Sequence, residues 1–245
     1  MKKILITGAN KSIGFETARQ LLQKGYYIFL GSRVLENGLR AVETLKSEGL
    51  NNVEAVQIDV SNQESIDAAR AEIGKNSEVL DVLINNAGIS GGSPQTALTA
   101  SIDKFKKAYE TNVYGVVRVT QTFIDLLKKS SEPRIVNVSS SQGSLTLASD
   151  PSSKYYTHKG AVYQSSKSAL NMYTITLAYE LRDTSFKVNA VDPGFTKTDF
   201  NNHRGTGTVE EAAKRIVKYA LIDKDGPTGK YFCEELFPET GECPW

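Results

Sequence analysis

The sequence predicts an α/β fold in which a doubly wound parallel sheet of about seven strands carries helices on both faces. Short β-branched apolar runs lie near residues 3–7, 27–32, 53–59, 79–85, 134–139, 187–192 and 230–233. They alternate with amphipathic segments near 13–24, 36–48, 63–73, 102–128, 162–182 and 209–221. This alternation is typical of parallel sheets, and the nearly continuous apolar character of the strand runs is typical of sheets covered on both sides.

Length and composition favour one domain over residues 1–245, because no linker, repeat or low-complexity tract divides the chain. The formal net charge of +1 gives no indication of nucleic acid or an anionic membrane as a partner. Two cysteines, Cys233 and Cys243, are too few to predict a disulfide scaffold or a metal site. No apolar run reaches membrane-spanning length and the first residues are typical of a buried strand, so we expect a cytoplasmic protein.

A glycine-containing turn, T-G-A-N-K-S-I-G at residues 7–14, follows the first strand and opens the first helix. Glycines at such a turn let backbone N–H groups approach a pyrophosphate, whose charge the helix N-terminus favours. Ser12 stands where a second glycine is more usual, and its hydroxyl is a candidate to cap the helix or contact a phosphate. A tight turn without a ligand is the alternative.

The end of the second strand bears on the choice of dinucleotide. Sites for NAD usually carry an acidic residue there, which holds the ribose 2′-hydroxyl. This chain has L-G-S-R instead, ending in Arg33, and we expect Lys11 of the glycine turn to lie nearby. Two cations without a carboxylate suit a 2′-phosphate, so the sequence favours NADP(H), with NAD(H) as the alternative. Solvated surface charges would give the same pattern.

Further motifs lie at the carboxyl ends of later strands, where ligands of such sheets bind. The carboxylate of Asp59, which precedes Val60, is placed to accept from an adenine amino group. N-N-A-G at 85–88 lets the backbone pass close to a cofactor, and P-G-F-T-K-T at 193–198 offers threonine hydroxyls to the nicotinamide amide and the phosphates. Each string is also explained by an ordinary turn, because its residue types are turn formers.

Tyr163 and Lys167 are the candidate proton-transfer groups. They lie four residues apart in a predicted helix, which places both side chains on one face. An ammonium beside a phenol favours the phenolate, so we expect a pKa below the ordinary value of about 10. Such a phenol can protonate the alkoxide formed when a carbonyl is reduced. Tyr155 and Lys159 share this spacing, so the pair alone is not specific.

Two other polar groups complete the candidate catalytic set. Ser140 lies in S-S-S at 139–141, where a hydroxyl can polarise a substrate carbonyl. Asn112, in T-N-V-Y-G, lies midway along a long helical segment although asparagine is a poor helix former. It is either a water-binding residue or a surface or bulge asparagine.

In order along the chain these motifs resemble the short-chain dehydrogenase/reductase family. The shared strings are T-G-x-x-x-x-x-G, D-V, N-N-A-G, T-N-x-x-G, a strand ending in S-S, Y-x-x-x-K and P-G-x-x-x-T. The resemblance implies a Rossmann-fold oxidoreductase that passes hydride between a nicotinamide and a ketone or aldehyde without a catalytic metal. It also implies a catalytic tetrad of Asn112, Ser140, Tyr163 and Lys167.

Within that tetrad, Tyr163 would be the acid, Lys167 its pKa-lowering partner and a ribose ligand, and Asn112 the water-holder. Tyr155 does not fit, because it precedes Pro193 by 38 residues, whereas Tyr163 precedes it by 30, close to the family pattern. The predicted cofactor contacts are Gly8, Asn10, Lys11, Ser12, Ile13, Gly14, Arg33, Asp59, Val60, Asn86, Ala87, Gly88, Tyr163, Lys167, Pro193, Gly194, Thr196 and Thr198.

Two segments are expected to contact the substrate. Ser140 and Tyr163 are 23 positions apart, more than in typical members, so residues at about 144–160 form an extra substrate loop. The glycine-containing stretch at 199–208 is typical of a mobile lid. The longer loop and the amino-acid sequence of the glycine turn favour the carbonyl-reductase-like members of the family. A 3-oxoacyl or steroid-type reductase is the alternative, and a non-catalytic dinucleotide-binding sensor is a further one.

Assembly and the C-terminus are the last expectations. Family members commonly pair the helices carrying the equivalents of Asn112 and Tyr163 across a two-fold axis. Apolar stretches at 113–119 and 170–181 therefore predict a homo-oligomer, a dimer or a tetramer. For the terminal Trp245 a free end is the favoured interpretation, and docking on a neighbouring subunit or on the pocket rim is the alternative.

Overall fold

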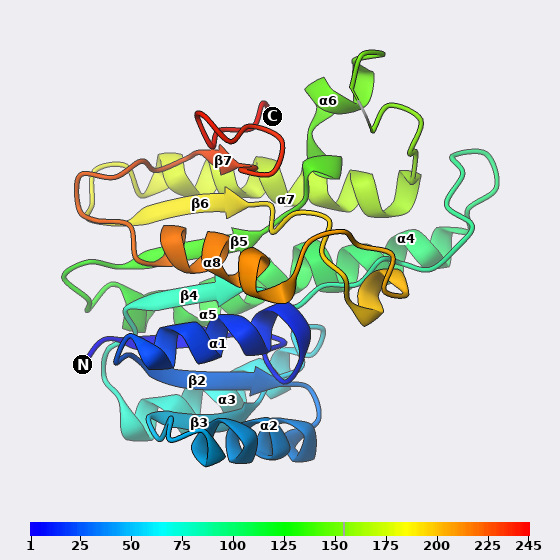
Figure 1. Cartoon of the computed structure of the whole chain (residues 1–245). Coiled ribbons are helices and arrows are strands. Elements are labelled where there is room, and N and C mark those ends of the chain that lie inside the picture. The colour runs from blue at the N-terminus through cyan, green and yellow to red at the C-terminus, as the bar shows by residue number, and fades with distance from the viewer. Residues whose placement is uncertain (154) are drawn as a thin grey trace.

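A single parallel sheet organises the protein, as a computed structural model that describes residues 1–153 and 155–245 shows (Figure 1). Its order is β3-β2-β1-β4-β5-β6-β7, and every pairing between neighbours is parallel. The strands are β1 (Lys3–Ile6), β2 (Tyr27–Ser32), β3 (Val53–Gln57), β4 (Val82–Asn85), β5 (Arg134–Val138), β6 (Lys187–Val191) and β7 (Tyr231–Phe232). The predicted fold class is confirmed. The order in which successive strands are added to the sheet reverses between β1 and β4, which is the switch point where such folds bind ligands.

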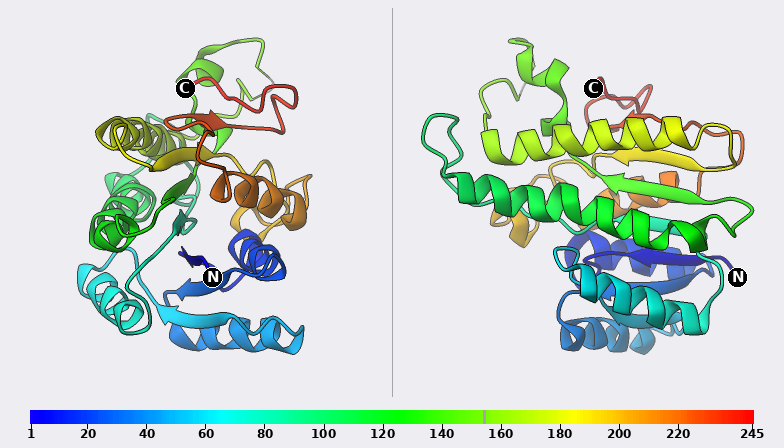
Figure 2. Two further views of the ribbon diagram at one scale, coloured as in Figure 1. Left: turned by 90° about the vertical axis from the view of Figure 1, so that its left-hand side faces the viewer. Right: turned by 180° about the vertical axis from the view of Figure 1, so that it is seen from behind.

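Helices cover both faces of the sheet, as the end-on view of Figure 2 shows. On one face lie α1 (Ser12–Gln23), α2 (Leu35–Ser47) and α8 (Val209–Ala220). On the other lie α3 (Gln63–Asn76), α4 (Ile102–Tyr109), α5 (Gly115–Leu127) and α7 (Ala161–Glu180). The short elements are the π-helical turn η1 (Glu110–Tyr114), the 3-10 turns η2 (Ser141–Gly143) and η3 (Asp199–Asn201), and α6 (Leu145–Ser149).

Each face of the sheet has its own apolar core, because successive strand side chains point to opposite faces. Ile4 and Ile6 of β1 are fully buried in the core beneath α1, α2 and α8, whereas Leu5 between them is buried in the core beneath α3, α5 and α7. Burial on both faces explains why the strand segments are apolar throughout.

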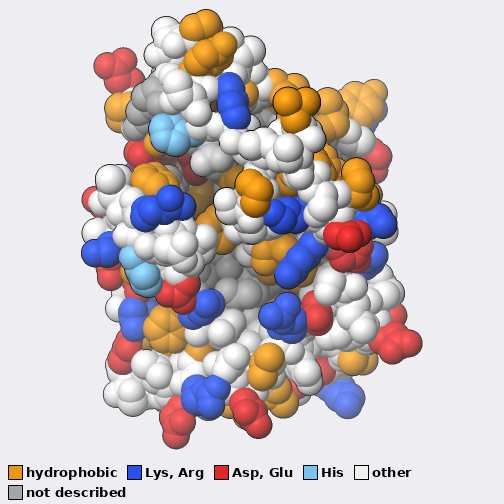
Figure 3. Space-filling model, turned by 90° about the vertical axis from the view of Figure 1, so that its right-hand side faces the viewer, with side chains coloured by type: hydrophobic (Ala, Val, Ile, Leu, Met, Phe, Trp, Pro, Cys, Tyr) orange, Lys and Arg blue, Asp and Glu red, His pale blue; other side chains and the backbone are white. Residues whose placement is uncertain are grey.

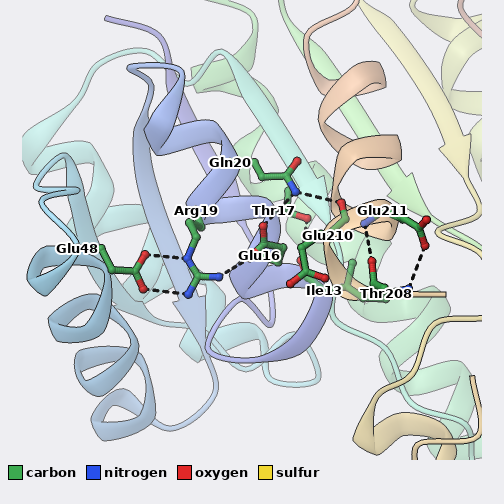
Figure 4. A network of polar contacts seen from close by, with 9 residues as sticks. All are labelled: Ile13, Glu16, Thr17, Arg19, Gln20, Glu48, Thr208, Glu210 and Glu211. Atoms are coloured by element: carbon green, nitrogen blue, oxygen red, sulfur yellow. Dashed lines mark hydrogen bonds and ion pairs between the residues drawn. The ribbon is translucent and has the colours of Figure 1, made fainter.

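Polar contacts fix α1, the helix that follows the glycine turn, to both of its neighbours (Figure 4). Arg19 donates two hydrogen bonds to the Glu48 carboxylate, at 2.8 and 3.0 Å, and also pairs with Glu16. On the other side Gln20 donates to the Glu210 carbonyl at 3.0 Å, at the start of α8. The bidentate geometry is the strong form of such a pair, and it holds the glycine turn at a fixed position above the sheet.

One predicted helix is interrupted. The segment at 102–128 forms α4, η1 and α5 in succession, so the helical run is continuous but widens into a π turn around Asn112. Single π turns inside helices occur mostly at functional sites. The sequence indicated this place through a poor helix former in mid-helix, although it did not predict the π geometry.

The C-terminal tail packs on the protein, so the interpretation of Trp245 as a free end is wrong. The Trp245 ring stacks on Tyr231 with the ring centroids 5.3 Å apart. Its carbonyl accepts hydrogen bonds from the Thr146 N–H and hydroxyl, at 3.1 and 2.7 Å. An antiparallel bridge joins Phe232 to Glu242 and turns the chain back along β7. The tail therefore supports α6, at the start of the predicted loop 144–160; Lys154 of that loop lies outside the described residues.

Across the described part of the chain, none of the helices combines the length and the apolar character needed to cross a membrane.

Candidate active site

The glycine turn leaves β1 through left-handed backbone, with a φ of 63° at Gly8 and of 53° at Ser12. Glycine adopts this region freely, whereas a residue with a Cβ is strained there. Ser12 thus occupies a backbone position suited to the glycine that is usual here. The predicted cap is wrong: α1 begins at Ser12, and the preceding Lys11 gives no side-chain cap either.

The end of β4 is fastened to this turn across the switch point. The Asn86 amide donates to the carbonyls of Thr7 and Gly8, at 2.9 and 3.0 Å. The Thr7 hydroxyl in turn accepts from the backbone N–H groups of Asn86 and Ala87, each at 3.0 Å. Gly14 lies so close that a Cβ added to it would meet Asn86 Nδ2 at 2.4 Å. The close approach explains why position 14 is a glycine.

A cavity of about 480 Å³ opens beside the turn, between it and α2. It is lined by Asn10, Lys11, Phe15, Asn37, Arg40, Ala41 and Thr44. Lys11 lines this cavity. The second cation that lines it is Arg40, whereas the sequence predicted Arg33 as the partner of Lys11. Arg33 follows β2 as an exposed side chain. Figure 3 shows the whole face at the carboxyl ends of the strands, which is hollowed at its centre and has basic side chains around the hollow.

Lys11 has a second contact that the sequence did not indicate. Its ammonium lies 2.9 Å from the Asp199 carboxylate, in the predicted lid, and His203 approaches the same carboxylate at 3.0 Å. Both side chains of the Lys11–Asp199 pair are more than half exposed, so the pair contributes little stability. It nevertheless places the lid directly over the glycine turn.

Three further predicted contacts, Asp59, Val60 and Gly88, lie beyond the ends of β3 and β4. The Asp59 carboxylate accepts from the N–H and hydroxyl of Ser61, at 3.0 and 2.6 Å. Val60 packs against the start of α5, where a Cβ added to Gly115 would meet Val60 Cγ2 at 2.9 Å. Gly88 adjoins the catalytic candidates, because a Cβ there would lie 3.4 Å from Asn112 Oδ1 and 3.7 Å from Lys167 Nζ.

The turn after β6 is held from several sides. Gly194 has a φ of 89°, and the Arg215 guanidinium donates to the Pro193 carbonyl at 2.6 Å. The Thr196 hydroxyl donates back to the Gly194 carbonyl at 3.2 Å, and Thr198 begins the 3-10 turn η3 with a capping box. Each of these predicted contact residues is therefore engaged in fixing the turn itself.

Tyr163 and Lys167 both lie in the first two turns of α7, and the prediction that they share a helix is confirmed. Lys167 is buried, lies 5.8 Å from the centroid of the Tyr163 ring, and donates to the Val138 carbonyl at 2.7 Å. Tyr155, with the same sequence spacing from Lys159, lies in the turns before α7. Only one of the two tyrosine–lysine pairs is therefore helical within the described residues.

The titration of this pair differs from the expectation. Burial raises the pKa of Tyr163 well above its ordinary value, a side-chain hydrogen bond with Ser140 lowers it in part, and the Asp192 charge raises it further. Burial lowers the pKa of the Lys167 ammonium to about 8, against an opposing effect of Asp192. The predicted lowering of the Tyr163 pKa is wrong for the protein alone, because removal of the phenol from water is the largest influence on this pKa and raises it.

Ser140 is positioned by a turn that is locked to α7. The neighbouring Ser139 hydroxyl donates to Asn171 Oδ1 at 2.6 Å, and the Gly143 carbonyl accepts from the Ser168 hydroxyl at 2.9 Å. Gly143 packs so tightly that a Cβ there would lie 2.8 Å from Lys167 Cβ. The serine turn and the helix bearing Tyr163 thus form one rigid unit.

Asn112 is fully buried, which excludes the surface interpretation. Its Oδ1 accepts from the Ile89 N–H at 2.9 Å, and its amide donates to the Ile89 carbonyl at 2.9 Å and to the Ser166 hydroxyl at 3.0 Å. The side chain therefore ties the π turn to the strand end at 85–88 and to α7. These contacts use both N–H donors of the amide and one of the two lone pairs of Oδ1, so the other lone pair and the backbone carbonyl are the acceptors left for the predicted water.

Three residues that lie at the site were not predicted from the sequence. Gln95 Oε1 accepts from the Tyr163 N–H at 3.0 Å and so caps α7 from a distant loop. The Phe200 ring lies edge-on to the Tyr163 ring, with centroids 5.5 Å apart. Asp192 is a buried carboxylate at the end of β6. Each acts through a contact between segments far apart in sequence. The predicted lid at 199–208 includes Phe200 but did not single it out, and the sequence carries no signal for Gln95.

A doubly wound sheet that brings a glycine turn, a tyrosine–lysine helix and a strand-end serine to one edge defines a dinucleotide-dependent oxidoreductase. Comparison with known proteins agrees, since the family described as short chain dehydrogenase matches residues 2–208. The chain belongs to this family, which confirms the resemblance, and it is an enzyme that acts on CH–OH and C=O groups.

Individual relatives match this chain over most of their length. The short-chain dehydrogenase anuI of Penicillium roqueforti is 38% identical over 89% of this chain and 87% of that protein. Salutaridine reductase of Papaver bracteatum is 32% identical over 96% of each. Among solved structures, an NADPH-bound carbonyl reductase from chicken fatty liver is 28% identical, with a TM-score of 0.83 over 100% of this chain and 99% of that one.

Proposed function

We propose that this enzyme reduces a ketone or aldehyde to the alcohol with NADPH, and that Tyr163 is the proton donor. The observation that carries the proposal is the pairing of a Tyr163 phenol, hydrogen-bonded to Ser140, with Lys167 one turn further along α7. A phenol with a raised pKa is protonated in neutral solution, which is the state that a general acid needs. When bound, the nicotinamide would supply the hydride.

The other residues then have separate roles. Ser140 donates to the carbonyl oxygen and favours the developing alkoxide. Lys167, beside the phenol, stabilises the phenolate that remains after the proton has left, and binds the ribose of the nicotinamide. The Asn112 side chain ties the π turn to the backbone next to Gly88. Asn112 also binds the water that returns a proton to the site. No metal enters this chemistry.

NADP(H) fits the cavity beside the glycine turn better than NAD(H). Lys11 and Arg40 both line this cavity, and no carboxylate is among its lining residues in the part of the chain that the structure describes. Two cations at one cavity suit a 2′-phosphate, for which Lys11 would exchange its exposed contact with Asp199. The tight packing at Gly14 supports the same site, because it holds the N-terminus of α1, where the charge of a pyrophosphate is favoured, against the end of β4.

We further propose one domain over residues 1–245 with substrate loops at about 144–160 and 199–208. Phe200 in the second loop gives the Tyr163 ring an apolar neighbour, which favours an aryl or other apolar ketone. A 3-oxoacyl or steroid-type reductase would use the same groups. A non-catalytic sensor is disfavoured, because all four tetrad residues are present.

Cytoplasmic location and a homo-oligomer, dimer or tetramer, complete the proposal. The supporting observation for assembly is an outer helical face on which α7 runs beside α4 and α5 (Figure 2). This face leaves Tyr114, Met172 and Tyr179 exposed by 49%, 61% and 64%. Large apolar side chains that are this exposed favour burial against a second copy.

The test is the initial rate of NADPH and of NADH oxidation with an aryl methyl ketone at equal cofactor concentrations, for the wild type and for Tyr163→Phe. We expect turnover with a strong NADPH preference, and a loss of at least about 100-fold in kcat for the variant, because its ring has no proton to donate. Tyr179→Phe, on an exposed part of the same helix, is the matched control and should keep the wild-type rate.

Four outcomes would contradict parts of this proposal. Full ketone reduction by Tyr163→Phe would contradict the mechanism. Equal or faster turnover with NADH would remove the argument from the two cations. Activity on acyl thioesters but not on aryl ketones would favour the 3-oxoacyl reductase, and cofactor binding without oxidation by any carbonyl would favour the sensor.

A further inference from the structure

Asp192 is a buried carboxylate at the point where three segments of the site meet. Its side chain lies at the end of β6 and the residue is 5% exposed. The Asp192 N–H donates to the Phe232 carbonyl in β7 at 2.8 Å, and the preceding Val191 carbonyl accepts from the Ser139 N–H at 2.8 Å. Asp192 therefore sits between the strand end that bears Ser140 and the end of β7.

The carboxylate binds donors from each of these segments. The Gly194 N–H donates to Oδ1 at 3.0 Å, and the Cys233 thiol donates to Oδ2 at 3.0 Å. The Ser141 N–H and hydroxyl also hydrogen-bond to it. Since Ser141 directly follows Ser140, the carboxylate holds the serine turn from below, while the Tyr231 hydroxyl donates to the Ser140 carbonyl from the other side.

The charge of this carboxylate faces the proton-transfer groups. Burial raises its own pKa, and the hydrogen bonds from Cys233, Gly194 and Ser141 lower it. A buried anion is costly unless a cation and hydrogen-bond donors compensate it. Lys167 is a cation that this charge stabilises, because the Asp192 charge raises the pKa of the ammonium. The titratable groups that feel the Asp192 charge are Tyr155 before α7, Tyr163 and Lys167 in α7, and Tyr231 and Cys233 in or next to β7.

We propose that Asp192 is a positioning residue for carbonyl reduction: it holds the Ser140–Ser141 turn against Tyr163 and supplies the anion that balances Lys167. This inference rests on the proposed function. It assigns a role to a side chain that the sequence presents merely as the first residue of a strand-end turn. The residue acts through Ser141 and through its charge, without touching the substrate.

The test is the pH dependence of kcat, in both reaction directions, for the wild type and Asp192→Asn. The amide has the same size and can still accept from the Gly194 N–H, but it has no charge and its nitrogen cannot accept from the thiol. We expect kcat to fall by at least tenfold with the KM for NADPH within about twofold, because the serine turn loosens while the cofactor site stays intact.

The decisive readout is the midpoint of the pH profile. The Asp192 charge raises the pKa of Tyr163, so its removal lowers that pKa. For alcohol oxidation, where the phenolate is the base, the rise in rate should begin at a lower pH, by roughly half to one pH unit. Asp223→Asn removes the same charge from an exposed turn after α8 and should leave both kcat and the midpoint unchanged.

Ser141→Ala is a second variant, which keeps the Asp192 carboxylate. It tests the positioning role of Asp192 if Asp192→Asn does not fold. It should lower kcat several-fold without moving the midpoint. Full kcat in Ser141→Ala, or a slower Asp192→Asn with an unmoved midpoint, would overturn the inference. An active wild type with an unaffected Asp192→Asn would overturn it too, whereas a wild type inactive on every carbonyl would contradict the proposed function instead.

Discussion

The two halves of the site are built in different ways. At the cofactor end, around residues 7–14, backbone atoms make the site, and what matters is the absence of side chains at Gly8 and Gly14. At the substrate end, side-chain contacts make it: Lys167 on the Val138 carbonyl, Ser139 on Asn171, and the half-buried Trp245 on Tyr231. The first half therefore depends on local backbone geometry, and the second on contacts between segments far apart in sequence.

The largest effect is expected where the backbone half allows no added atom. Gly14→Ala would place a Cβ 2.4 Å from Asn86 Nδ2 and 2.7 Å from the Gly8 carbonyl oxygen, so the turn itself must move. We expect the free energy of unfolding to fall by about 3 kcal/mol, as for overpacked cores, together with a higher KM for NADPH. Chemical denaturation and initial rates measure the two quantities.

Gly74→Ala is the matched control for this substitution. Its Cβ would meet only the flexible end of Arg70, 2.5 Å from Nη1, and the helix α3 gains from alanine. We therefore expect unchanged or slightly higher stability, by at most about 1 kcal/mol. If Gly14→Ala were as stable as Gly74→Ala, the claim that close backbone approach shapes the cofactor end would be wrong.

This contrast explains what could be predicted from the sequence. The strands and the glycine turn have local signals, namely apolar runs and glycine placement, and the structure places them within a few residues of the expected bounds. Asn112 also had a local signal, as a poor helix former in mid-helix. The Lys11–Asp199 pair, Gln95 as the cap of α7 and Arg40 in the cavity join distant segments, and no local pattern indicates such partners.

The Tyr163 pKa was mispredicted for a related reason. Sequence spacing gives the distance between two side chains on a helix, but burial depends on everything else that packs around them. Here the surroundings include Phe200, and burial of the phenol raises its pKa by more than the hydrogen bond with Ser140 lowers it.

The second-largest effect is expected at the substrate end of the site, which depends on side-chain contacts. Trp245→Ala removes the ring stacked on Tyr231, although the backbone hydrogen bonds with Thr146 can persist. We expect the free energy of unfolding to fall by about 2 kcal/mol, less than for a fully buried tryptophan. The KM for the ketone should rise more than that for NADPH, because the tail supports α6 and not the glycine turn. Thermal unfolding and steady-state kinetics report both.

Trp245→Phe keeps an aromatic ring on Tyr231 and is the control. It should retain most of the stability that the alanine variant loses. Wild-type stability in Trp245→Ala would restore the interpretation of the C-terminus as a free end.

The smallest effect returns to the backbone half and sharpens the comparison. Ser12→Gly removes the Cβ from a residue whose backbone has a φ of 53°. A Cβ in this left-handed region costs about 1–2 kcal/mol. The greater freedom of glycine in the unfolded chain offsets part of this gain, so we expect a net stabilisation of about 0.5–1 kcal/mol. Ser12→Ala keeps the strain and should not be stabilised.

The KM for NADPH in the same two variants tests the Ser12 hydroxyl. If the KM rises in both variants, the hydroxyl contacts a phosphate, and if it rises in neither, the position serves the turn through its backbone alone. A less stable Ser12→Gly would show that the hydroxyl stabilises the turn by more than the strain costs.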